Sequence, residues 1–187
     1  MKRTLFPGYS VGTDAYEDIK EICPAYGKKA AIIGGKHALA AAQDKIIAAA
    51  KEAGIEIIGP FWYGGEASVE NIEMLKSKVA DADMIFAVGG GKAIDTCKVL
   101  SHSTDRPFFT FPTIASTCAS CTSLGILYHP DGSLREYSFS KIPPKHIFID
   151  TQIIATACSR QLCSNVWTPR TTRGLRLASF SGGKFLR

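Results

Sequence analysis

The chain of 187 residues lacks several features that mark specialised classes of protein. No apolar run approaches 18 residues, so the sequence contains no segment that could span a membrane. The six cysteines, at positions 23, 97, 118, 121, 158 and 163, are too few and too scattered for a disulfide scaffold. The charged start has no apolar core of a secretory signal behind it. We therefore expect a cytoplasmic protein with reduced thiols and no membrane partner.

Acidic residues are absent from the C-terminal stretch. Residues 158–187 hold six of the 22 Lys and Arg and none of the 17 Asp and Glu, which leaves residues 1–157 with 16 basic and 17 acidic side chains. Such a balance is typical of an ordinary enzyme surface and not of a nucleic-acid-binding one. The net charge of +5 thus comes from the end of the chain, and we expect no nucleic-acid partner.

The stretch 158–187 also lacks any sustained period of 2 or 3.6 residues, so the pattern predicts no folded element there. We divide the chain into a folded part, residues 1–157, and a basic tail, residues 158–187. Two interpretations of the tail stay open. It is a non-native or disordered end, which the missing periodicity favours, or it is a segment that binds an acidic partner.

The most informative motif present is the run of three glycines and a lysine, Gly89, Gly90, Gly91 and Lys92. It follows the apolar residues 84–88 and opens an amphipathic stretch, so a strand, a tight turn and a helix N-terminus come in succession. Glycines let the backbone approach an anion, and the unpaired N–H groups and the positive helix end favour negative charge. The motif predicts a phosphate-bearing ligand, and the alternative is a plain tight turn.

Short apolar runs alternate with helical periods along residues 1–157, and a further short helix is expected at 16–23. The predicted strands are 30–34, 56–61, 84–88, 108–112 and 146–150, and the predicted helices are 39–53, 69–79 and 93–101. Residues 124–128 and 134–139 flank a Pro-Asp-Gly turn and predict a β-hairpin. This rhythm predicts a doubly wound α/β fold with a mainly parallel sheet. The glycine turn and the loop after Pro112 should then face one cleft at the carboxyl ends of the strands.

Three segments together carry a family resemblance: 89–98 (Gly-Gly-Gly-Lys-Ala-Ile-Asp-Thr-Cys-Lys), 111–117 (Phe-Pro-Thr-Ile-Ala-Ser-Thr) and 149–155 (Ile-Asp-Thr, then Ile154-Ala155). In this order they resemble the glycerol dehydrogenase group of the iron-containing (metal-dependent) alcohol dehydrogenases. The likeness runs over about residues 12–164 and includes the Gly64-Gly65-Glu66 loop. It implies the Rossmann-like dinucleotide domain of the dehydroquinate synthase-like fold, without the C-terminal helical domain that follows it in the family.

The resemblance also implies roles for individual residues. The pyrophosphate of NAD or NADP would lie at the glycine turn, with Asp95 in the first helical turn beside it. In full, the residues implied in cofactor binding are Gly35, Gly89, Gly90, Gly91, Lys92, Asp95, Thr113, Ser116, Thr122, Leu124 and Tyr128. Asp95 could instead serve the helix dipole, and Leu124 and Tyr128 could be half-buried hairpin residues.

Two departures from the family pattern bear on cofactor and substrate. Gly34-Gly35-Lys36 stands where glycerol dehydrogenases commonly have Gly-Asp-Lys. Loss of that carboxylate removes repulsion against a 2′-phosphate, so both NAD and NADP remain candidate cofactors. On the substrate side, Cys118 replaces an expected Asp, which resembles a hydroxycarboxylate dehydrogenase branch. A redox role for the Cys118/Cys121 pair and a zinc site at Cys158 and Cys163 are weaker alternatives.

The metal ligands that the family supplies, one Asp and two His, have no counterparts here. Counting from Asp150, the family Asp falls on Thr168. The codons of Trp167 and Thr168 necessarily contain GAC, an Asp codon, in a shifted frame, and we interpret this as a frameshift near Ser164. No zinc or iron site is expected in this chain.

We therefore expect the N-terminal NAD(P)-binding part of a dehydrogenase that transfers hydride between a nicotinamide cofactor and a small polyol or a 2-oxo/2-hydroxy acid. The truncated chain itself is expected to be inactive, and a homo-oligomer remains open. The alternative from a different class is a non-catalytic nucleotide-binding module whose basic tail engages a partner.

Overall fold

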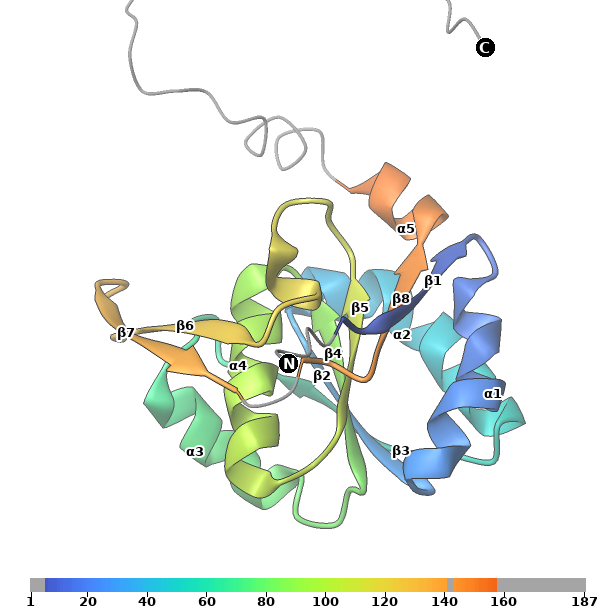
Figure 1. Ribbon diagram of the computed structural model, residues 1–187, viewed down its shortest axis with the longest axis horizontal. Coiled ribbons are helices and arrows are strands. Elements are labelled where there is room, and N and C mark those ends of the chain that lie inside the picture. Colours follow the sequence, from blue (N-terminus) through green and yellow to red (C-terminus); the bar gives the residue numbers. More distant parts are fainter. Residues whose placement is uncertain (1–5, 141–142, 158–187) are drawn as a thin grey trace, which may run out of the picture.

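A parallel sheet of six strands forms the centre of the protein (Figure 1). The computed structural model describes residues 6–140 and 143–157. The strands, in sheet order, are β1 (Gly8–Gly12), β8 (His146–Asp150), β5 (Phe108–Pro112), β4 (Met84–Gly89), β2 (Lys29–Gly34) and β3 (Glu56–Trp62). The predicted doubly wound α/β fold is confirmed. The predictions for the tail 158–187, with Cys158, Cys163 and Thr168, lie outside the described residues.

Helices cover both faces of the sheet (Figure 1). The helical elements are η1 (Ala15–Asp18), α1 (Ile19–Ile22), η2 (Cys23–Tyr26), α2 (Lys36–Glu52), α3 (Val69–Lys78), α4 (Gly91–Thr104), η3 (Cys118–Ser120) and α5 (Thr151–Thr156). The first four of these, η1 to α2, lie on one face, and α3 and α4 lie on the other. None of the helices in the described part of the chain is both long and apolar enough to cross a membrane.

The side chains of the central strands alternate between two hydrophobic cores, as the period of two requires. In β4, Met84, Phe86 and Val88 face α1 and α2, whereas Ile85 and Ala87 face α3 and α4. All five are fully buried, which is why this strand reads as an uninterrupted apolar run.

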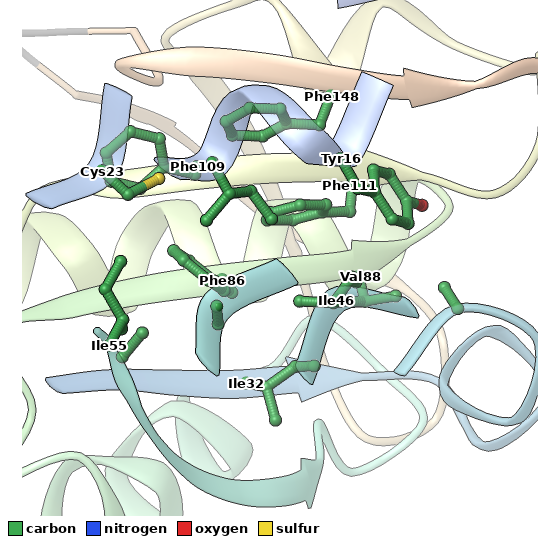
Figure 2. Close-up of a cluster of buried hydrophobic side chains, with 14 of the residues drawn as sticks. Tyr16, Cys23, Ile32, Ile46, Ile55, Phe86, Val88, Phe109, Phe111 and Phe148 are labelled. Atoms are coloured by element: carbon green, nitrogen blue, oxygen red, sulfur yellow. The ribbon is translucent and has the colours of Figure 1, made fainter. Parts of the chain in front are cut away.

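Aromatic rings fill the core beneath α1 and α2 (Figure 2). Phe111 stacks on Phe148 with ring centroids 4.9 Å apart, and Tyr16 meets Phe111 edge-on at 5.3 Å. Phe86 and Phe109 extend the cluster at 5.8 Å. This packing fixes β4, β5 and β8 against one another and so sets the relative positions of the loops that follow them.

The strand β1 and the helix α5 were not predicted from the sequence. β1 is a short edge strand with exposed Tyr9 and Val11, so it lacks the apolar run that marks the other strands. α5 has only six residues and depends on its cap, because the Asp150 carboxylate accepts hydrogen bonds from the backbone N–H groups of Gln152 and Ile153 at 2.8 and 3.1 Å. The predicted hairpin is present as β6 (Leu124–Tyr128) and β7 (Leu134–Phe139).

Candidate functional site

A cavity of about 920 Å³ opens at the carboxyl ends of β2, β4 and β5. Residues 35–38, 41, 62, 63, 89–93, 113, 114, 153, 156 and 157 line it. Its walls are the starts of α2 and α4, the segment after β3, the loop after β5 and the end of α5. The glycine turn and the loop after Pro112 therefore face one cleft, as predicted.

The glycine turn exposes backbone donors to this cavity. Gly89 has φ of 142°, a value that favours glycine, and Gly90 is the N-cap of α4 without any side-chain cap. The helical ladder begins with the hydrogen bond from the Ile94 N–H to the Gly90 carbonyl, at 3.1 Å. The amides of residues 91–93 therefore have no acceptor within the helix and are available to an anion.

Lys92 lies at this turn but is already paired. Its Nζ is 2.6 Å from a carboxylate oxygen of Glu66 and 5.9 Å from the ring centroid of Tyr128. The hydrogen bond to Glu66 raises the pKa of Lys92, so the lysine stays protonated. This partnership was not predicted, because Glu66 lies 26 residues earlier in the sequence and nothing local links the two side chains.

A second helix N-terminus borders the same cavity. Gly35 is the N-cap of α2, again without a side-chain cap, and the ladder begins with Leu39 N–H donating to the Gly35 carbonyl at 2.8 Å. Lys36 follows, with its Nζ 4.6 Å from the centroid of the Trp62 ring. No Asp or Glu is among the residues that line the cavity in the described part of the chain. The site is thus electropositive on two sides.

Three of the residues implied by the resemblance meet at a different point, the ammonium of Lys98. Lys98 is fully buried, and its Nζ donates to Asp95 Oδ1 at 3.0 Å and to the Leu124 carbonyl at 2.6 Å, with Thr122 Oγ1 at 3.5 Å. Burial raises the pKa of Asp95, and the nearby Lys98 opposes this rise. Lys98 is a residue that the sequence analysis missed; the only local signal was its spacing of three from Asp95 on a helix.

The position predicted for Asp95 needs correction. Asp95 is the fifth residue of α4 and not part of its first turn, because the helix begins at Gly91. Its side chain is directed to Lys98 and does not line the cavity. Five other residues with an implied role also lie outside the cavity lining: Ser116, Cys118, Thr122, Leu124 and Tyr128. Gly35, Gly89, Gly90, Gly91, Lys92 and Thr113 do line it.

The four cysteines in the described ranges differ sharply in exposure. Cys118 is exposed and Cys121 is partly exposed, on one turn closed by the hydrogen bond from the Cys121 N–H to the Cys118 carbonyl at 3.0 Å. Cys23 and Cys97 are fully buried, and burial raises the pKa of Cys23 to about 12 and that of Cys97 as well.

This difference predicts the order of thiol modification. In the native protein at pH 7.5, we expect a maleimide reagent to label Cys118 within minutes and to leave Cys23 and Cys97 unmodified until the chain unfolds. Peptide mapping by mass spectrometry assigns each label. Rapid native labelling of Cys97 would contradict the packing of α4.

The described residues do not offer a metal site. Over residues 6–140 and 143–157 there is no group of three or more His, Cys, Asp or Glu side chains that could hold a metal ion. Among these described residues, His37 is the only one of the four types that lines the cavity.

Comparison with known proteins assigns the family. The model of the iron-containing alcohol dehydrogenases matches residues 7–151. The chain belongs to this family. A glycerol dehydrogenase of Escherichia coli is 34% identical over 164 residues, which cover 86% of this chain and 44% of that protein. Hydroxycarboxylate dehydrogenase A of Escherichia coli is 31% identical over 139 residues, 74% of this chain and 38% of that protein.

A solved structure extends the likeness to three dimensions. The crystal structure of glycerol dehydrogenase from Schizosaccharomyces pombe matches with a TM-score of 0.77 and 31% identity, covering 88% of this chain and 42% of that chain. The predicted membership in the iron-containing alcohol dehydrogenases is confirmed. The chain spans less than half the length of these relatives.

Proposed function

We propose that residues 6–157 form the nicotinamide-dinucleotide-binding part of a glycerol dehydrogenase-like enzyme. One observation carries the proposal: uncapped N-termini of two helices, α2 and α4, border a single cavity of about 920 Å³ at the carboxyl ends of neighbouring parallel strands. In open α/β sheets this is the place where ligands bind. The size is within the range of cofactor sites.

The glycine turn would hold the diphosphate. The amides of residues 91–93 donate hydrogen bonds to its oxygens, and the α4 dipole adds favourable potential. Lys92 would stand beside them as one half of an ion pair with Glu66, so its ammonium does not need to be ordered when the ligand arrives. Thr113, buried at the end of β5, contributes a hydroxyl to the adjoining wall.

The Lys98 centre would act as a scaffold for the nicotinamide half. It fixes the start of β6 against α4, because a single ammonium binds both the Leu124 carbonyl and Asp95. The positions of Thr122 and Leu124, where the loop leads into the hairpin, would thereby be fixed relative to α4. A nicotinamide ring bound there would supply the hydride-transfer chemistry. The substrate would be a small polyol or a 2-hydroxy acid, in keeping with the glycerol and hydroxycarboxylate dehydrogenases above.

We further propose that the 187-residue chain binds nucleotide without catalysing hydride transfer by itself. The support is the set of side chains around the cavity. The described residues include no cluster of metal ligands that could hold an ion to stabilise the negative charge developing on the substrate oxygen. Cys118, placed in the loop after β5, would lie on the substrate side.

Titration with NADH and NADPH tests the binding site directly. We expect saturable binding with a Kd in the micromolar range, together with quenching of Trp62, because that indole lines the cavity and is 45% exposed. A Trp62→Phe variant should keep binding, measured by calorimetry, and lose most of the quenching. Absence of saturable binding with both nucleotides would refute the proposal.

A further inference from the structure

We infer that Cys118 and Cys121 form a redox site, a pair that converts reversibly between two thiols and one disulfide bond within a single turn of the chain. The two residues belong to η3 and its C-cap, in the loop between β5 and β6. Neither of them lines the cavity described above, so this site is independent of the proposed function.

The backbones of the two cysteines lie at bridging distance. The Cys121 N–H donates to the Cys118 carbonyl at 3.0 Å, which is the hydrogen bond that closes a 3₁₀ turn. Such a turn rises about 2.0 Å per residue, so three residues separate the two Cα atoms by roughly 6 Å. Disulfide bonds join residues whose Cα atoms are about 4.4–6.8 Å apart. The turn therefore has the spacing that a disulfide requires.

The two side chains also lie on the same side of the turn. A 3₁₀ helix has three residues per turn, so side chains at positions i and i+3 lie over one another. Cys118 and Cys121 have this spacing, and the Cys121 Sγ is 3.2 Å from the Cys118 carbonyl oxygen. The Cys121 sulfur is thus already folded back onto residue 118. Closing the bridge requires a choice of side-chain rotamers and no rearrangement of the backbone.

The two residues between the cysteines hold the turn in place. Ala119 is buried in the core that contains α3 and α4. The Ser120 carbonyl accepts a hydrogen bond at 3.0 Å from Oγ1 of Thr110, which is fully buried in β5. Cys118, in contrast, is exposed and Cys121 is partly exposed. The inner residues therefore fix the turn, while the cysteines remain accessible to a small reagent.

The oxidant for this site is a low-molecular-weight disulfide such as glutathione disulfide. The thiolate of the more exposed Cys118 attacks one sulfur of that molecule, and one glutathione leaves as a thiolate. The Cys121 thiolate then attacks the Cys118 sulfur of the mixed disulfide and releases the second glutathione. Two protein thiols are thereby oxidised to one S–S bond, and glutathione disulfide is reduced to two glutathiones, which take up the two protons.

Equilibration of the full chain with mixtures of glutathione and glutathione disulfide tests the site. After acid trapping and alkylation, peptide mapping by mass spectrometry gives the fraction of chains with a bridge between Cys118 and Cys121. We expect the equilibrium constant for this bridge to be about tenfold larger in the native protein than in the chain unfolded in urea, because only the native turn holds the pair at bridging distance. Equal constants, or a smaller constant in the native protein, would overturn the inference and leave the proposed function standing.

The double variant Ser120→Cys with Cys121→Ser is the matched control. It keeps two cysteines in the same turn but moves the second one to a position that points about a third of a turn away from Cys118. The native advantage should then disappear, with the equilibrium constant at or below that of the unfolded chain, while circular dichroism reports the fold of the variant. A shifted pair that bridges as readily as the natural one would show that closeness in sequence is sufficient, and this too would overturn the inference.

Discussion

A Gly91→Asp variant is expected to lose nucleotide binding by about 100-fold while its fold becomes no less stable. Gly91 is the first residue of α4, and an acidic side chain in the first turn of a helix interacts favourably with the dipole. Replacing a helical glycine also reduces the conformational entropy of the unfolded chain. The same carboxylate would stand beside the amides of residues 91–93 and repel a diphosphate, a cost of about 2–3 kcal/mol.

The opposite directions of the two effects separate a phosphate cradle from a plain tight turn. Gly91→Ala is the control, because it introduces the same Cβ, 3.3 Å from Thr117 Oγ1, without the charge. We expect this control to weaken binding by no more than about fivefold. Calorimetric titration with NADPH gives the affinity, and thermal unfolding gives the stability. Should the Asp and Ala variants bind equally well, the diphosphate would not lie at this turn.

The glycine turn could be found from the sequence because its signals are local. A fully buried strand, three contiguous glycines and a helix start follow one another, and each constrains the next. The same holds for β2, β5 and the β6–β7 hairpin, whose apolar runs and turn residues lie within a few positions of one another. The family resemblance also rested on short local motifs. It therefore implied roles for residues whose contacts in the fold could not be predicted from the sequence.

What could not be predicted depends on contacts between distant segments. The pairing of Lys92 with Glu66 spans 26 residues, and the capture of the Leu124 carbonyl by Lys98 also spans 26. A lysine in an amphipathic helix is ordinarily exposed, so its complete burial follows only from the hairpin that covers α4. Asp95 consequently serves Lys98, a role that its place in the motif did not reveal.

Removing the carboxylate of Asp95 is expected to destabilise the protein by about 3–5 kcal/mol, since it would leave the buried ammonium of Lys98 without its counter-ion. In Asp95→Ala the remaining acceptors are the Leu124 carbonyl and the more distant Thr122 hydroxyl. Such a loss is a large fraction of the stability of a typical domain. Urea unfolding followed by circular dichroism measures the free energy of unfolding of the variant and the wild type.

The double variant Asp95→Leu with Lys98→Met provides the control. Burial raises the pKa of Asp95 in spite of Lys98, so the ionised pair is itself costly to desolvate, and an apolar pair of similar volume should recover all but about 1–2 kcal/mol of the wild-type stability. The remaining deficit corresponds to the Leu124 carbonyl, which loses its donor at 2.6 Å. A double variant as unstable as Asp95→Ala would show that the ammonium is needed for its hydrogen bonds to β6 and not merely tolerated. A single variant of wild-type stability would instead mean that Lys98 reaches solvent when Asp95 is absent, contrary to its complete burial between α4 and the hairpin.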